Sequence, residues 1–167
     1  DVKRGLRDLN GNGVVCGLTE ISEINAFKVD KNGNKTPCEG ELFYRGVNIY
    51  DLVDGLVKRG RFGFEETAYL LLFGTLPTAE ELENFNEMLC DYRPLPPNFV
   101  RDIIMKNPSA DMMNMLARCV LSLYSYDKRP DRTTPGNTLR QCVQLIARFP
   151  LLAVYSQNAY NYYNTDS

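Results

Sequence analysis

The sequence predicts a mainly α-helical fold, a multi-helix domain with a small antiparallel β-ribbon near the N-terminus. Before residue 50, β-forming residues cluster between turn signals, whereas after it apolar residues recur with the helical period. The 167 residues are 44% hydrophobic, which is enough to build a core. We therefore expect one structural unit made of an N-terminal segment, residues 1–49, and a helical part, residues 50–167.

The β-ribbon is expected to be a hairpin that turns at Asn32-Gly33, a dipeptide typical of tight β-turns. A calcium-binding loop is the alternative, because four residues have the spacing of its oxygen ligands: Asp30, Asn32, Asn34 and Glu41. Lys35 stands where such a loop needs glycine, and the flanking segments have the composition of strands. These departures favour the hairpin.

The strongest helical pattern covers residues 64–85 and predicts two helices joined by a tight corner. The first is so apolar that we expect it to be buried on nearly all sides, and Gly74 provides the permissive backbone that ends it. Thr78 and Glu81 have the spacing of a capping box, which begins the second helix. This helix is amphipathic, with an apolar stripe formed by Leu82, Phe85, Met88 and Leu89.

Shorter helical patterns complete the fold and bring the expected number of helices to about seven. One begins at residue 50, a second covers residues 99–104, and a third covers residues 112–126 behind a cap at Ser109 or Asp111. In the third, the apolar residues Met113, Leu116, Val120 and Leu123 lie on one face. The last regular helix, residues 137–149, should end or kink at Pro150, with a further apolar segment after it.

Composition argues against several functions. With 19 basic and 21 acidic residues, the net charge of -2 provides no field that would collect nucleic acid or an anionic membrane. The sequence shows no signal peptide and no apolar run of about 18 residues. We therefore expect a cytoplasmic protein that binds neither nucleic acid nor membrane.

The sequence also argues against a zinc site and against proton transfer by histidine. The chain has no histidine, the residue that most often moves protons at neutral pH. Its five cysteines are widely spaced and form no CxxC pair, which argues against zinc and for free buried thiols: Cys16, Cys38, Cys90, Cys119 and Cys142. We expect no metal ion.

Five stretches occur in an order that resembles the N-terminal part of bacterial citrate synthases. The most specific are ELFYRGVNIYDL and FEETAYLLLFGTLPTAEEL, and the others are GLRDLNGNGVVCGLTEIS, SADMMNMLARCVLSL and LRQCVQLIARFP. The resemblance implies that the chain is part of the large, mostly helical domain of this family. It also implies an acyltransferase, a homodimer in its full form, that condenses acetyl-CoA with oxaloacetate to citrate and free CoA.

In that family an aspartate and two histidines carry out the chemistry, and they lie in the C-terminal half. The absence of histidine here agrees with this. The resemblance therefore implies that this chain holds no catalytic residue, is inactive alone, and keeps no permanently bound cofactor, with acetyl-CoA as the substrate of the full-length enzyme.

Two arginines match family residues that contact CoA phosphate groups. Arg7 stands in a Gly-x-Arg turn, and Arg132 precedes the helix that carries Leu-Ile-Ala-x-x-Pro, after a one-residue gap. The planar guanidinium suits phosphate because it offers several donors. Solvated surface arginines are the alternative for both residues.

Two other functions stay open. A methylcitrate synthase differs in the acyl group that it transfers, and the family's acyl-pocket residues lie downstream of this chain. The second alternative is a helical module that uses the same scaffold for dimerisation or interaction, without chemistry.

Overall fold

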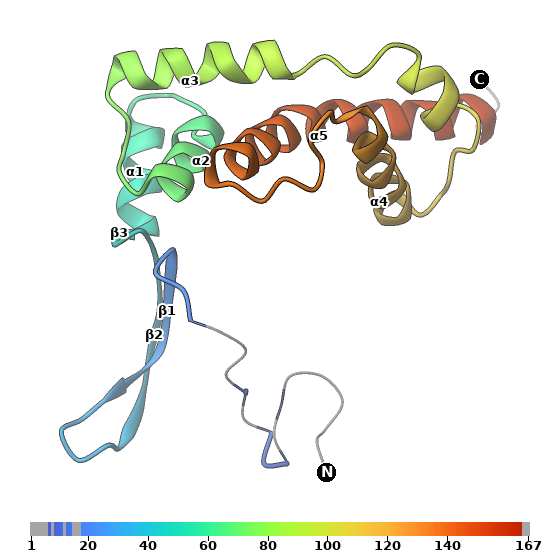
Figure 1. Cartoon of the computed structure of the whole chain (residues 1–167). Helices are drawn as coiled ribbons and strands as arrows, with labels where there is room; N and C mark the ends of the chain where they lie inside the picture. The colour runs from blue at the N-terminus through green and yellow to red at the C-terminus, as the bar shows by residue number, and fades with distance from the viewer. Residues whose placement is uncertain (1–6, 8, 12, 15–17, 165–167) are drawn as a thin grey trace. The chain divides into compact units, whose positions relative to one another are not determined.

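The computed structural model describes residues 7, 9–11, 13–14 and 18–164. The described part consists of helices and one small antiparallel sheet, which confirms the predicted fold class (Figure 1). The described helical part contains five α-helices, a π-helical turn and a 3-10 turn, where about seven helices were expected. The chain divides into two compact units, Asp1–Leu82 and Glu83–Ser167.

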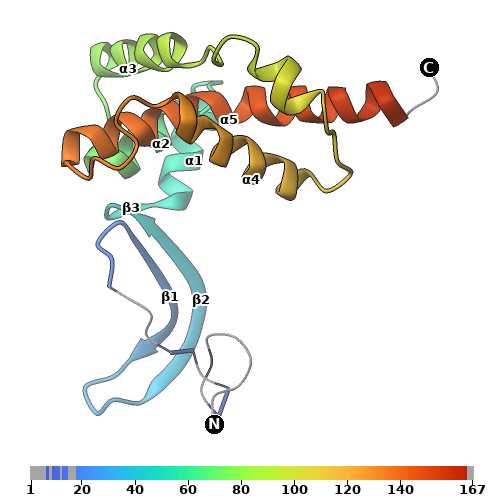
Figure 2. The same ribbon diagram turned by 45° about the vertical axis from the view of Figure 1, so that its right-hand side comes forward.

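The sheet of the first unit contains strands β1 (Ser22–Val29), β2 (Lys35–Tyr44) and β3 (Val47–Asn48) in that spatial order. The β1–β2 hairpin runs from the pair Ser22 and Tyr44 to the pair Val29 and Lys35, with one irregularity after Asn25 (Figure 2). At its turn, the Asp30 carboxylate accepts hydrogen bonds from the backbone N–H groups of Asn32 and Asn34. The predicted hairpin is therefore confirmed, and its turn closes through Asp30.

The two-residue connection between β2 and β3 explains the Tyr-Arg-Gly motif. Arg45 has φ 50° and Gly46 has φ 80°, so both central residues have the positive φ of a type I′ hairpin turn. Glycine adopts this backbone without strain, which gives the motif a physical reason for its glycine. The turn leads directly into helix α1 (Ile49–Lys58), whose N-terminus is capped by Asn48.

Helices α1 and α2 (Phe64–Phe73) share a small core in the first unit. It consists of Leu52, Leu56 and Leu70. Three partly buried residues pack against it, two from the sheet and the first residue of α1: Tyr44, Val47 and Ile49. The expectation that α2 is buried on nearly all sides is wrong for this structure, because only Glu66 and Leu70 of this helix are buried. Phe64 and Phe73 are 57% and 41% exposed, and the other residues of α2 are partly buried.

The corner after α2 contains both predicted helix caps. Gly74 has φ 88°, the left-handed conformation of a C-terminal cap, and its N–H donates to the Leu70 carbonyl. Thr78 and Glu81 exchange two hydrogen bonds, of 2.8 and 3.2 Å, between side chain and backbone. This is the expected capping box, and it begins helix α3 (Ala79–Tyr92). Of the predicted stripe on α3, Phe85 and Leu89 are buried, Leu82 is partly buried and Met88 is exposed.

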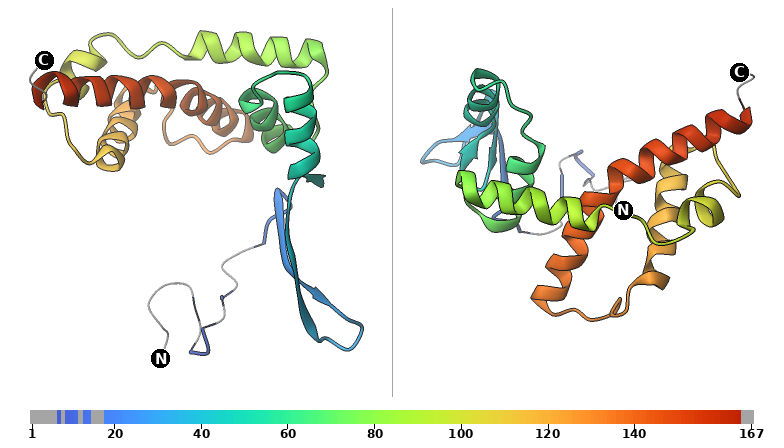
Figure 3. Two further views of the ribbon diagram at one scale, coloured as in Figure 1. Left: turned by 180° about the vertical axis from the view of Figure 1, so that it is seen from behind. Right: turned by 90° about the horizontal axis from the view of Figure 1, so that it is seen from above.

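The second unit is built around helices α4 (Met112–Leu123) and α5 (Pro135–Asn164), which pack against each other and against the π-helical turn η1 (Val100–Ile104) (Figures 1 and 3). The core contains side chains from all three: Phe99, Ile104, Met115, Cys119, Leu123, Leu152 and Ala159. Asp111 caps α4, as one of the two predicted alternatives, by accepting from the Asn114 N–H. A 3-10 turn, η2 (Tyr124–Tyr126), follows α4.

The predictions about these two helices hold only in part. Of the apolar face predicted for α4, Leu123 is buried, Leu116 and Val120 are partly buried, and Met113 is 76% exposed, while Met115 and Cys119 are buried in addition. Of the two effects predicted for Pro150, an end or a kink, the end is wrong, because α5 continues through this residue and has 30 residues in all. Pro150 is exposed, so water can reach the carbonyl that loses its backbone donor. Among the described residues, no helix combines the length and hydrophobicity needed to cross a lipid bilayer.

Candidate functional site

A pocket of about 420 Å³ lies inside the second unit, where η2 and the following loop meet α5. Its size falls within the range of small-molecule sites. Four cationic side chains line it, Lys128, Arg129, Arg140 and Arg148, together with one carboxylate, Asp127. The remaining lining is largely aromatic and aliphatic, including Tyr124, Tyr126, Val120, Leu123 and Leu145. The pocket therefore combines positive charge with an apolar wall.

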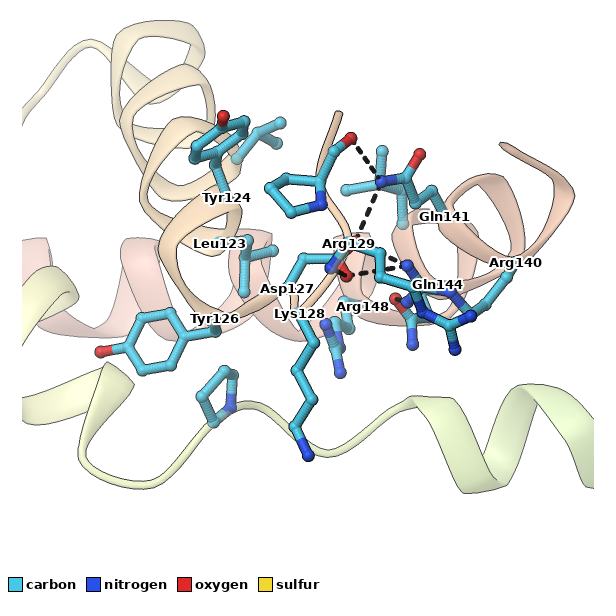
Figure 4. Close-up of a pocket in the computed structure, with 14 residues that line it drawn as sticks. Leu123, Tyr124, Tyr126, Asp127, Lys128, Arg129, Arg140, Gln141, Gln144 and Arg148 are labelled. Carbon is cyan, nitrogen blue, oxygen red and sulfur yellow. Dashed lines mark hydrogen bonds and ion pairs between the residues drawn. The ribbon is translucent and has the colours of Figure 1, made fainter. Parts of the chain in front are cut away.

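Asp127 organises the polar side of this pocket. Its carboxylate accepts hydrogen bonds from Arg140 Nη2 at 2.7 and 2.8 Å, from Gln141 Nε2 at 2.9 Å and from the Arg129 N–H at 2.9 Å (Figure 4). The bonds from the Gln141 side chain, the Arg129 backbone and Arg140 lower the pKa of Asp127 to about 2. Asp127 is thus ionised at neutral pH and neutralises one of the four cations.

Arg140 is held in place on every side of its guanidinium. Besides the bonds to Asp127, its Nε and Nη2 donate to Asn137 Oδ1, and its Nη1 donates to Gln144 Oε1. Asn137 is itself buried and donates to the carbonyl oxygens of Arg129 and Arg132. This network fixes the loop that carries Lys128 and Arg129 against the start of α5.

Arg148 is half-buried and has a different environment. Its Nε donates to the Tyr92 carbonyl at 3.1 Å, and no described carboxylate lies within ion-pair distance of its guanidinium. Burial lowers its pKa, with a further contribution from the charge of Arg140, although an arginine stays protonated at neutral pH. Arg148 is therefore a partly desolvated cation whose Nη groups have no protein partner in the described part of the chain.

Lys128 and Arg129 are exposed, and their charged groups form no ion pair with any residue that the structure describes. In the close-up, the side chains of Lys128 and Arg148 extend in the same direction, away from Tyr124 (Figure 4). Tyr124 donates to the Asp131 carboxylate and so holds the other end of the loop. Three of the four pocket cations are thus available to a ligand.

The structure places the two arginines predicted to contact phosphate in different units, and it does not place Arg132 in the pocket. Arg7 is exposed in the first unit, forms an isolated bridge with Gly13, and donates from Nη1 to the Gly11 carbonyl at 2.8 Å. Arg132 is exposed in the second unit, in the loop before α5. Their contact with phosphate stays a prediction.

The cysteines agree only partly with the expectation of buried thiols. Cys16 lies outside the described residues. The other four are free, but only Cys119 is buried, whereas Cys38 and Cys142 are intermediate and Cys90 is exposed on α3. Cysteine, aspartate and glutamate side chains form no group of three able to hold a metal ion in the described ranges.

The pocket residues were not singled out in the sequence, although one signal was present. Arg140, Gln144 and Arg148 recur every four residues along α5, which places a polar stripe along one face of the helix. The charged loop at residues 127–132 precedes this stripe. Only the fold shows that η2 and the loop bring Tyr126, Asp127 and Lys128 onto the same stripe.

Comparison with known proteins gives consistent matches over nearly the whole chain. The family described as "Citrate synthase, C-terminal domain" matches residues 8–166. A citrate synthase of Acidithiobacillus ferridurans is 36% identical over 152 residues, covering 87% of this chain and 35% of the relative. The 2-methylcitrate synthase 1 of Corynebacterium glutamicum is 29% identical over 151 residues, covering 90% of this chain and 34% of the relative.

A solved structure agrees with these relatives. The crystal structure of citrate synthase from Pyrobaculum aerophilum superposes with a TM-score of 0.70 at 26% identity, covering 93% of this chain and 37% of that one. The chain thus spans about a third of the length of the proteins that it matches. Because the family match extends over almost all of its residues, the chain belongs to the citrate synthase family.

Proposed function

We propose that this chain is part of an acyltransferase that condenses acetyl-CoA with oxaloacetate to give citrate and free CoA. The observation that carries the proposal is the family match over residues 8–166. The 36% identity to a citrate synthase over 152 residues supports this substrate pair. The condensation is the activity of the relatives, and we assign it to a longer protein of their size.

The proposed reaction joins two carbon atoms and cleaves a thioester. A base removes a proton from the acetyl methyl group, the resulting carbanion attacks the ketone carbon of oxaloacetate, and the new alkoxide takes up a proton. Water then cleaves the thioester, which releases the CoA thiol. Such a reaction needs a positioned base and a donor at the developing oxyanion, and we propose that both lie outside these 167 residues.

The absence of histidine supports this division of roles. Neutral-pH proton transfer most often uses histidine, and this chain has none. We propose that Arg7 and Arg132 contribute substrate contacts, by donating to CoA phosphate groups in a cytoplasmic homodimer. Both side chains are exposed, so a phosphate group can reach them.

A second acyl donor is favoured by one specific observation. The chain is 29% identical over 151 residues to a 2-methylcitrate synthase. 2-Methylcitrate contains one methyl group more than citrate, so its acyl donor carries three carbon atoms, as propionyl-CoA does. We therefore propose propionyl-CoA as the alternative substrate.

A thiol-release assay tests the proposed function. This chain and a protein extended to the length of the relatives are each incubated with oxaloacetate and either acetyl-CoA or propionyl-CoA. We expect thiol release by the extended protein only, and the faster acyl donor identifies the substrate. An extended protein that releases no thiol from either donor favours a non-catalytic interaction module.

A further inference from the structure

We propose that the outer edge of β1 is an interaction surface for a second copy of this chain. Two β1 strands pair antiparallel about a two-fold axis and join the two hairpins into one continuous sheet. In the described part of the chain, β1 is the outer strand of the sheet and pairs with β2 on its inner side (Figure 2). The proposal rests on this hairpin and not on the proposed condensation.

The first half of β1 directs the backbone groups of Ser22 and Ile24 away from β2. Along an antiparallel ladder, pairs with and without hydrogen bonds alternate. The Arg45 N–H donates to the Ile21 carbonyl. This bond flanks the pair of Ser22 and Tyr44, so that pair is not hydrogen-bonded, and the same holds two residues further, at Ile24. The N–H and C=O groups of Ser22 and Ile24 therefore point outward.

The second half of β1 directs Phe27 and Val29 outward for the same reason. The Asp30 N–H donates to the Asn34 carbonyl. This bond flanks the pair of Val29 and Lys35, so that pair is not hydrogen-bonded, and neither is the pair at Phe27. The register shift in the middle of the hairpin changes the alternation. The outward residues are therefore even-numbered before the shift and odd-numbered after it.

The outward residues also carry the exposed apolar side chains of the strand. Ile24, Phe27 and Val29 are 75%, 53% and 62% exposed. Side-chain direction alternates together with backbone direction along a strand, so these three side chains share one face of the hairpin. A two-stranded hairpin is marginally stable by itself, and an unpaired apolar edge is a template for another strand. The edge of β1 thus has the properties of a strand-pairing surface.

The sequence of β1 is complementary to itself in one register. A two-fold axis at the centre of the strand pairs Ile24 with the partner's Phe27, and Ser22 with the partner's Val29. All four outward residues can then exchange backbone hydrogen bonds with the second copy. The pair of Ile24 and Phe27 occurs twice, and pairs of a β-branched and an aromatic side chain stabilise antiparallel sheets. This register therefore covers the apolar face of both hairpins.

The same register pairs opposite charges on the other face of the strand. Glu23 lies directly opposite the partner's Lys28, and the two-fold axis repeats this pair. Neither side chain forms an ion pair with a residue that the structure describes. Opposite charges across a pair of strands stabilise it, and like charges destabilise it. The charges therefore favour a second copy of this chain as the partner, in a contact that closes as a dimer.

The test follows amide hydrogen exchange of this chain by NMR over a series of protein concentrations. We expect the N–H groups of Ile24 and Phe27 to exchange rapidly in dilute solution and to become protected at high concentration. The midpoint gives the Kd of the dimer. The N–H of Asn25, which faces β2, should exchange slowly throughout and so reports that the hairpin is formed.

Two results of this experiment overturn the proposal. Amides of Ile24 and Phe27 that stay unprotected at every concentration show that copies do not pair through β1, even where the chain associates through another surface. Protection of these amides in a chain that stays monomeric shows that the chain covers this edge itself.

Exchange of the two charges tests the register. Glu23→Lys and Lys28→Glu each place like charges opposite one another twice in the dimer, and each should raise the Kd about tenfold. Both substitutions in one chain recreate the opposite pairs and should restore the original Kd. The matched controls are Glu39→Lys and Lys31→Glu, which make the same charge changes at exposed positions of the hairpin outside β1. Single substitutions that change the Kd no more than these controls, or a combined substitution that does not restore it, overturn the proposed pairing.

Discussion

Arg45 donates two hydrogen bonds to the carbonyl oxygen of Leu71, from Nε at 3.2 Å and from Nη2 at 3.0 Å. Leu71 lies in the last turn of α2, where backbone carbonyls have no partner within the helix. Gly74 satisfies the neighbouring carbonyl of Leu70. The turn between β2 and β3 thus completes the C-terminal cap of α2 and connects the sheet to the helices of the first unit.

Arg45→Lys should therefore destabilise the first unit while keeping the charge. A lysine has no second donor in the fork geometry, so the substitution removes at least one charge-assisted hydrogen bond and costs about 1 kcal/mol. Urea unfolding monitored by circular dichroism measures the change. Arg101→Lys is the control, since Arg101 is an exposed arginine paired with its neighbour Asp102. Equal stability of the two variants contradicts the role of Arg45.

Thr78→Ala should lower stability by removing half of the capping box. The Thr78 hydroxyl accepts from the Glu81 N–H, and alanine leaves this donor at the start of α3 without its partner. Loss of such a cap costs about 1 kcal/mol. Thr75→Ala serves as the control, because Thr75 is an exposed threonine of the same corner, outside the capping box. Urea midpoints that shift equally in both variants show that the cap has no special effect.

Asp127 should make the second unit sensitive to acid. Its pKa is lowered from 3.8 to about 2, first by the Gln141 side chain and then by the Arg129 N–H and Arg140. A carboxyl group with a lowered pKa in the folded state stabilises the protein above pH 3.8, and this contribution is lost as the pH falls toward 2. After allowance for solvent screening, the contribution is about 1 kcal/mol.

Asp127→Asn tests this contribution. At pH 6 it should lower the free energy of unfolding by about 1 kcal/mol, and the difference from the unchanged chain should shrink as the pH approaches 2. Asp91→Asn, which makes the same charge change on the exposed surface of α3, is the control. A constant difference across this pH range means that ionisation of Asp127 does not stabilise the fold.

Arg7→Ala should raise the apparent KM for acetyl-CoA in the extended protein and leave the KM for oxaloacetate nearly unchanged. The reason is that a phosphate contact belongs to the CoA part of the substrate pair only. Arg132→Ala should have the same effect, and Arg101→Ala should have none. Equal increases in both KM values would contradict the assigned phosphate contacts.

The isolated chain should self-associate. Several large apolar side chains of the first unit are strongly exposed around α2: Phe62 (98%), Phe64 (57%), Leu76 (45%) and Phe73 (41%). Exposed apolar groups of this kind favour association. Light scattering at micromolar concentration should show a species larger than a monomer, and Phe62→Ser with Phe64→Ser should reduce its size. A clean monomer before substitution contradicts the prediction.

Residues that lie close together in the sequence predicted where α2 ends and where α3 begins. The capping box at Thr78 and the cap at Gly74 depend on residues within four positions of each other, and both are confirmed. The face of α4 was not predictable in the same way, because apolar residues occur around most of that helix. Met115 is buried and Met113 exposed as a result of packing against α5 and η1, a tertiary effect.

The candidate pocket required the fold for the same reason. Its lining extends from Pro96 to Arg148, so residues far apart in the sequence form it. Asp127, Arg140 and Gln141 become partners only when the loop returns to α5. The sequence contained the charged loop and the polar stripe of α5, but it did not contain their relative position.

The thiol-release assay of the extended protein tests the central claim most directly. With acetyl-CoA and oxaloacetate, the account predicts release of CoA thiol by the extended protein and none by this chain of 167 residues, which has no histidine. Repetition with propionyl-CoA decides between the two acyl donors. Thiol release by this chain alone would contradict the assignment of the chemistry to residues outside it, and no release by the extended protein with either donor would contradict the proposed condensation.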